Sequence, residues 1–117
     1  MKTYTLRHDD TYWECKIEID LKKAEKPIRE MVDFWGGSEE RLQDNDGSYL
    51  HTFLKQIANE IHRIVHSTNY NTYGVIQIFA SPNKEGWTLM DGSSGIKIID
   101  VDDPYFTDDQ FNIIENS

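Results

Sequence analysis

The sequence contains one cysteine and no long apolar run, and each of these shortages excludes a class of protein. Cys15 has no second cysteine to pair with inside the chain, which excludes a small secreted scaffold stabilised by internal disulfide bonds. No segment approaches the roughly 20 apolar residues of a membrane-spanning helix, and the opening residues lack the apolar core of a signal peptide. These observations predict a soluble, cytoplasmic protein without membrane contacts.

Positive charge is also scarce, because 12 Lys and Arg stand against 21 Asp and Glu, for a formal net charge of −9. The imbalance is concentrated in residues 91–117, where seven acids are accompanied by Lys97 alone. Proteins that bind nucleic acids neutralise phosphates with clustered Lys and Arg, so direct nucleic-acid binding is not expected. An acidic surface instead favours a protein partner with a basic surface, although excess charge also serves solubility.

The composition is that of a folded protein, since 38% of the 117 residues are apolar and 12% are aromatic. A chain of this length forms one domain and buries enough surface to hold a core without disulfides. We therefore expect a single domain over residues 1–117.

Two segments near the start alternate as strands do. Residues 11–20 place Trp13, Cys15, Ile17 and Ile19 on one face, which predicts a strand with a buried face and a solvated face. Residues 2–7 are a weaker candidate strand, and the polar residues 8–11 between the two suit a hairpin turn.

The next segments of the chain have apolar residues at helical spacing. Residues 25–37 carry an apolar stripe that includes Trp35, with Pro27 in the first turn and Gly36–Gly37 at the end. Ser38 is expected to cap a short helix over residues 39–44. The strongest helix signal spans residues 48–67, where Ser48 is a candidate N-cap. Its apolar stripe consists of Leu50, Phe53, Leu54, Ile57, Ala58, Ile61, Ile64 and Val65.

The remaining segments read as strands. Residues 71–80 are rich in β-formers, residues 95–101 alternate after a glycine-serine loop, and residues 111–115 are a last candidate. The predicted fold is α+β: a single, mostly antiparallel sheet with the element order β-β-α-α-β-β-β and with the helices packed on one face.

The loop of residues 90–95, MDGSSG, does not have the properties of a phosphate site. A strand follows it rather than a helix N-terminus, no lysine accompanies it, and Asp91 would repel an anion. Tight-turn chemistry explains its composition. The acids from Asp100 onward begin like a calcium loop, but Tyr105 and Phe111 stand where the glycine and the closing glutamate are needed.

Other candidate reactive residues also have structural explanations. His62 and His66 lie one helical turn apart, the spacing that suits zinc, but the sequence supplies no third ligand. They are expected on a solvated helix face. Cys15 lies on the buried face of its strand, where a thiol is inert. The sequence therefore predicts no catalytic residue, no metal, no cofactor and no enzymatic activity.

The acidic C-terminal third is the candidate interaction site. Asp100 and Asp102 are expected on one strand face, and aromatic side chains accompany the acids that follow. Trp87 either fastens its own loop or serves as a binding anchor. The alternative reading of the segment is that Phe106 packs under the turn while the acids stay solvated. The candidate interaction residues are Asp100, Asp102, Asp103, Tyr105, Phe106, Asp108, Asp109 and Trp87.

Several short phrases resemble a family of phage- and prophage-encoded proteins, domain-of-unknown-function family 2528. They are Phe34–Trp35, Asp46–Gly47 before a helix with His51, residues 71–74 (NTYG), residues 85–87 (EGW) and residues 90–92 (MDG). The resemblance covers residues 12–115. The family has no assigned activity or catalytic residues, so the resemblance implies only a phage accessory protein in a bacterial cytoplasm.

These observations favour a non-enzymatic phage accessory protein that acts by protein–protein interaction, through an acidic edge that mimics nucleic acid. A small metal- or ligand-binding domain is one alternative. A structural phage component that forms homo-oligomers is the other.

Overall fold

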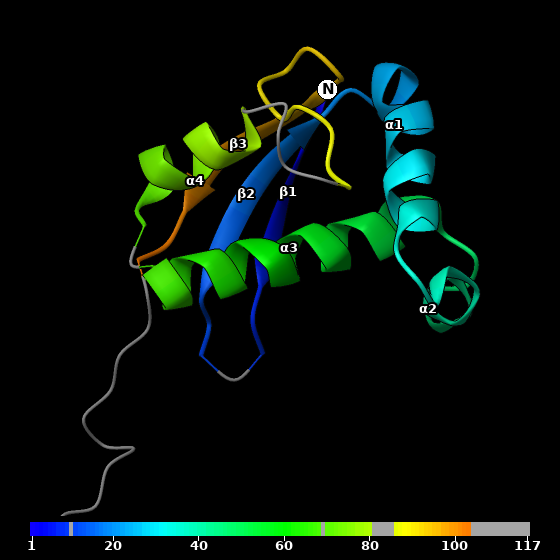
Figure 1. The fold of residues 1–117 in the computed structure, drawn as a ribbon, viewed down its shortest axis with the longest axis horizontal. Coiled ribbons are helices and arrows are strands. Elements are labelled where there is room, and N and C mark those ends of the chain that lie inside the picture. The colour runs from blue at the N-terminus through cyan, green and yellow to red at the C-terminus, as the bar shows by residue number, and fades with distance from the viewer. Residues whose placement is uncertain (10, 69, 81–85, 104–117) are drawn as a thin grey trace, which may run out of the picture.

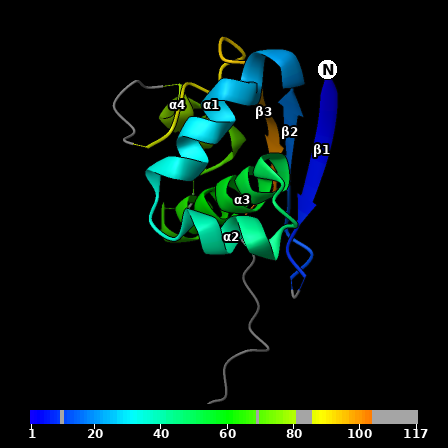
Figure 2. The same cartoon turned by 90° about the vertical axis from the view of Figure 1, so that its right-hand side faces the viewer.

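Three antiparallel strands form one sheet in the order β1-β2-β3, and the helices lie together on one of its faces (Figures 1 and 2). The structure is a computed structural model that describes residues 1–9, 11–68, 70–80 and 86–103. The α+β class and the one-sided packing are therefore confirmed. The elements are β1 (Lys2–Arg7), β2 (Glu14–Ile19), α1 (Leu21–Phe34), α2 (Ser38–Asp44), α3 (Tyr49–Thr68), α4 (Thr72–Phe79) and β3 (Ile96–Val101).

The central strand β2 shows the alternation that the sequence predicts. Cys15, Ile17 and Ile19 are each at most 1% exposed, whereas Lys16 between them is exposed. The inward side chains of β2 face the helical layer, because alternate residues of a strand point to opposite faces. Both strand neighbours of β2 are antiparallel to it.

Helix α3 supplies the other half of the core. Phe53, Ile57, Ile61 and Val65, at helical spacing, are fully buried. The Ser48 hydroxyl accepts the N–H of His51 at 3.1 Å, so the predicted N-cap is confirmed. Although α3 is 20 residues long, neither it nor any other helix in the described part of the chain is long and apolar enough to cross a membrane.

Helix α1 begins four residues earlier than the sequence pattern indicates. Asp20 is its N-cap, and the Asp20 carboxylate accepts the Lys23 N–H at 3.5 Å. Pro27 therefore lies inside the helix, not in its first turn. The helix ends at Phe34, and Trp35 is 36% exposed. The expectation that Trp35 lies on the buried stripe is wrong, because the chain leaves the helix before completing that turn.

The corner between α1 and α2 depends on Arg41. Its guanidinium donates to the carbonyl oxygens of Val32 (2.9 Å), Trp35 (3.3 Å) and Gly36. Val32 lies in the last turn of α1, where carbonyl oxygens lack helical partners, and Trp35 and Gly36 follow directly. Ser38 is the first residue of α2, and the N-cap is Gly37, so the predicted capping role of Ser38 is wrong.

The segment at residues 71–80 corrects another prediction, because most of it is helix α4 and not a strand. The Asn71 carboxamide accepts the Gly74 N–H at 2.9 Å, which starts the helix. Val75 and Phe79, four residues apart, are buried, so tertiary burial outweighs the β-propensity of the segment. The strand expected at residues 111–115 lies outside the described residues.

The loop at residues 90–95 is a tight turn, as predicted. The Asp91 carboxylate accepts the Ser93 N–H and the Ile96 carbonyl accepts the Gly92 N–H, both at 2.9 Å. Gly95 lies close to the start of α1, where its carbonyl accepts the Asp20 N–H at 2.8 Å. The loop therefore holds the start of β3 against the N-terminus of α1 through this hydrogen bond.

Candidate functional site

The end of β3 carries the described part of the predicted acidic site. Asp100, Asp102 and Asp103 are all exposed. In Figure 1 this end of β3 lies beside the start of α4, at the opposite end of the molecule from α1 and α2. The acids of this surface, Asp100, Asp102 and Asp103, are called the acidic end below.

A β-bulge lies near the end of β3. Lys16 pairs with Asp100, but Ile17 pairs with Ile98, so Ile99 has no partner on β2. A bulge bends the strand and redirects the side chains beyond it. Ile99 is 39% exposed, which adds an apolar contact beside the acids.

Thr72 of α4 supports Asp100. Its hydroxyl accepts the Val101 N–H at 3.1 Å, and its proton can go to the Val101 carbonyl at 2.9 Å or to the Asp100 carboxylate at 3.3 Å. The hydroxyl thus takes the place of a neighbouring strand at Val101. Asp100 is thereby held by α4, an element that the sequence pattern misassigned.

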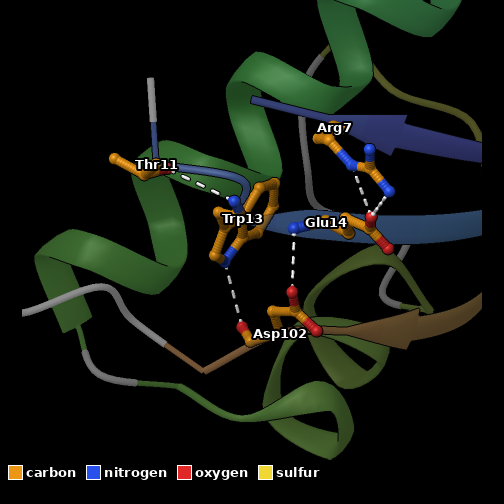
Figure 3. Close-up of polar contacts among 5 residues, drawn as sticks. All are labelled: Arg7, Thr11, Trp13, Glu14 and Asp102. Atoms are coloured by element: carbon orange, nitrogen blue, oxygen red, sulfur yellow. Dashed lines mark hydrogen bonds and ion pairs between the residues drawn. The ribbon is translucent and has the colours of Figure 1, made fainter. Parts of the chain in front are cut away.

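Asp102 is held by the β1–β2 hairpin (Figure 3). Its N–H donates to the Glu14 carbonyl at 2.9 Å, and its carboxylate accepts the Glu14 N–H at 2.9 Å. Its carbonyl accepts the indole N–H of Trp13 at 3.1 Å. These contacts fix both the backbone and the side chain of Asp102 on the start of β2.

The neighbouring carboxylate of Glu14 is paired. The Arg7 guanidinium contacts the same Glu14 oxygen through Nε at 2.6 Å and through its terminal nitrogen at 2.5 Å (Figure 3). Glu14 therefore adds little net charge to the acidic end. Within the described ranges, Asp100, Asp102 and Asp103 form no ion pair, so the negative charge of the acidic end comes from these aspartates.

Trp87, the one further predicted interaction residue that the structure describes, lies apart from the acidic end. Trp87 is half-buried, with its ring 5.8 Å from Phe79 and 6.1 Å from Trp35. These contacts fasten the Trp87 loop to the end of α4 and to Trp35, which directly follows α1. Tyr105, Phe106, Asp108 and Asp109 lie outside the described residues, so their part in the site stays a prediction.

A second group of polar side chains joins the hairpin to α3. His8, His62 and His66 form a stack in which neighbouring ring centroids are 4.8 Å and 4.0 Å apart. Trp13 meets this stack edge-on, 5.1 Å from His62 and 6.1 Å from His66. His62 and His66 are half-buried, so the prediction of a solvated histidine face is wrong, because the hairpin covers it.

The polar atoms of the stack differ in their surroundings. His66 Nδ1 lies 2.8 Å from the His62 carbonyl, and His8 Nδ1 lies 3.2 Å from the Thr11 hydroxyl. His62 Nε2 is buried, with no hydrogen-bond partner among the described residues. Burial, followed by the charges of His66 and His8, lowers the pKa of His62 below its usual 6.5.

A reactive thiol, or a group of metal-ligating side chains, in the described part of the chain would favour catalysis. Burial, followed by the charge of Asp102, raises the pKa of the Cys15 thiol to about 12, which disfavours the nucleophilic thiolate. Across the described residues, no three His, Cys, Asp or Glu side chains are arranged to hold a metal ion.

Sequence reasoning missed the residues that organise both groups. The sequence pattern places His8 in a turn, assigns Thr72 to a strand and gives Glu14 no role. The helical spacing of His62 and His66 was the available signal, but the third ring comes from a distant segment. Such a contact depends on how the hairpin docks on α3.

Comparison with known proteins gives related sequences. The family model described as "Protein of unknown function (DUF2528)" matches residues 14–113. The lambda prophage-derived protein ea10 of Escherichia coli O6:H1 and protein ea10 of Escherichia phage lambda are each 35% identical over 108 residues, which cover 87% of this chain and 85% of each relative. No solved structure matches.

Proposed function

Because the chain belongs to the DUF2528 family, whose relatives above are phage and prophage proteins, we propose that it is a non-enzymatic phage accessory protein. It acts by binding another protein through the acidic end. The partner presents a basic surface, of the kind that also binds nucleic acid, and the aspartates occupy positions that phosphates would take.

The fixed position of Asp102 is the observation that supports this proposal. A carboxylate that mimics a phosphate must be held in place before binding, because ordering it on binding costs conformational entropy. The hydrogen bonds to Trp13 and Glu14 hold Asp102 on the hairpin. Thr72 places Asp100 at the same end of the sheet.

Charge favours the same kind of partner. Residues 91–117 hold seven of the 21 acids and one base, so the electrostatic field around this part of the chain attracts cationic surfaces. Steering of this kind acts mainly on the association rate and weakens with salt.

The test uses charge removal without loss of hydrogen bonds. In the triple variant Asp100→Asn, Asp102→Asn and Asp103→Asn, the amide oxygens can still accept from Thr72 and Glu14. A control variant removes three exposed charges from α2, through Glu39→Gln, Glu40→Gln and Asp44→Asn. Tagged wild-type protein is used to isolate and identify the bacterial partner.

The association rate of the purified pair is then measured over a range of salt concentrations. We expect the acidic-end variant to associate about tenfold more slowly at low salt, with a weaker salt dependence, because electrostatic steering typically changes such rates by one or more decades. The control should stay close to wild type. Equal rates for both variants would show that the acidic end is not the binding surface.

A further inference from the structure

The histidine stack joins two parts of the molecule that are distant in sequence. His8 belongs to the connection after β1, while His62 and His66 lie one turn apart on α3. Trp13, directly before β2, is only 4% exposed and packs against both helical imidazoles. The stack is therefore part of the contact that holds the hairpin on α3.

Among the described residues, the charged side chains on the elements that carry the stack are largely engaged with other partners. On the hairpin, Arg7 and Glu14 are paired with each other, and on α3 Glu60 is paired with Arg63. At the end of β3, the Asp102 carboxylate accepts the Glu14 N–H. Lys55 of α3 lines the same groove as His8 and His62 and adds positive charge. Asp9 is exposed, and Asp10 lies outside the described residues.

Protonation of such a stack is unfavourable while it is closed. A proton on His62 Nε2 would create a buried N–H without an acceptor among the described residues, and an unsatisfied buried donor is costly. Charge on His8 or His66 would repel a charged His62 across a gap of less than 5 Å between ring centroids. Moving the end of the hairpin that carries His8 and Trp13 away from α3 relieves both penalties.

Trp13 connects this contact to the acidic end. One side of its indole meets the imidazoles, and its N–H donates to the Asp102 carbonyl (Figure 3). Glu14, the next residue, holds the Asp102 backbone and carboxylate. A shift of Trp13 therefore disturbs the contacts that fix Asp102.

We propose that the His8–His62–His66 stack is a proton-sensitive clamp that holds Trp13 on α3 when the rings are neutral and releases the hairpin and Asp102 when they are protonated. The effect on partner binding rests on the proposed function of the acidic end. The clamp itself does not. The pKa of His62 supports this direction, because burial and the two neighbouring imidazoles lower it.

The test follows hydrogen exchange in the free, full-length protein. The reporting groups are the indole N–H of Trp13 and the backbone N–H groups of Glu14 and Asp102, with the Ile17 N–H as a core reference. Protection factors, corrected for the intrinsic pH dependence of exchange, are measured from pH 7.5 to pH 5. We expect the three reporting groups to lose at least about tenfold protection below roughly pH 6.5, the ordinary histidine range, while Ile17 stays protected.

Two variants isolate the histidines. His62→Phe keeps an aromatic ring against Trp13 but cannot take up a proton, so its hairpin should stay protected at pH 5. His51→Gln removes an exposed histidine from the same helix and should behave as wild type. Should His62→Phe fold poorly, His8→Phe serves instead, and we expect the proton NMR titration of His62 to move toward the ordinary histidine value. Unchanged protection in wild type, or equal loss in His62→Phe, would overturn the clamp.

Partner binding at both pH values separates the two proposals. Both proposals are supported if, at pH 5, the wild-type reporting groups lose protection while those of His62→Phe keep it, and if only wild type then binds the partner more weakly. The same exchange pattern with equal binding by both proteins supports the clamp and contradicts the acidic end as the binding surface.

Discussion

Thr72 replaces a missing strand neighbour with a single hydroxyl group. It contacts both backbone polar groups of Val101 as well as the Asp100 carboxylate. Val101 itself is 5% exposed, so water has little access to these groups. Single side chains that satisfy buried backbone groups in this way often contribute more to stability than their size indicates.

We expect Thr72→Val to destabilise the protein by about 1–3 kcal/mol, because valine has the same shape but leaves the Val101 N–H and carbonyl without their partner. Urea unfolding monitored by circular dichroism measures this difference. Thr3→Val, at an exposed position of β1, is the matched control and should change stability by less than about 0.5 kcal/mol. A similar small effect of Thr72→Val would contradict the structural role of the hydroxyl.

His62 shows how burial of one residue changes the meaning of a pattern. Histidines four residues apart on a helix suggest a metal site or an exposed face. Here the ring lies between two other imidazoles and against Trp13. The sequence contained both helical histidines, but only the docking of the hairpin identifies the third partner.

At the scale of elements, the turn at residues 90–95 sets the spacing between the start of β3 and α1. Gly95 has a positive φ of +85°, and a Cβ there would lie 2.9 Å from the backbone nitrogen of Ala24. Gly92, in the same turn, has a φ of +98°, but a Cβ there would have no neighbour within 4 Å among the residues that the structure describes. A comparison of substitutions at the two glycines therefore distinguishes the cost of backbone strain from the cost of steric contact with α1.

We expect Gly92→Ala to cost roughly 1 kcal/mol, the usual penalty for a left-handed alanine. Gly95→Ala should cost about 1–3 kcal/mol more, because the start of α1 must move to accept the methyl group. Chemical denaturation of both variants provides the comparison. Equal costs would mean that α1 moves away from the loop without loss of stability.

The long periodic elements were predictable, and the short ones were not. α3 and β2 were predicted correctly because many buried side chains repeat the same period in each. α4 has eight residues, and its buried pair Val75 and Phe79 is too short a pattern to outweigh its β-branched composition. The link between Asp102 and the hairpin joins residues 88 positions apart, a contact that no local pattern specifies.

For the whole molecule, two groups make stability depend on pH in separate ranges. The pKa of His62 is lowered in the folded state, chiefly by burial, so below about pH 6.5 the unfolded chain binds more protons there than the folded chain. Stability is therefore lost as the pH falls through this range. The pKa of Asp91 is lowered by hydrogen bonds from Ser93, and its contribution is lost only in more acidic solution, below about pH 4.

We therefore expect the Tm of wild type to fall by a few degrees between pH 7.5 and pH 5.5, measured by scanning calorimetry. His62→Phe should flatten this part of the curve, because residue 62 no longer titrates. Asp91→Asn should leave it unchanged and alter only the acidic limb below about pH 4. A wild-type Tm that is constant from pH 7.5 to pH 5.5 would contradict the inferred protonation of the stack.

The buried thiol of Cys15 has a practical consequence for following the hairpin. It is the chain's one cysteine, it is 1% exposed, and burial raises its pKa to about 12. A thiol introduced through Tyr12→Cys, at a position that is 71% exposed, would therefore react with maleimide dyes or nitroxides far faster than the native one. A single spectroscopic probe can thus be placed beside Trp13 in the folded protein without first removing any natural residue from the core.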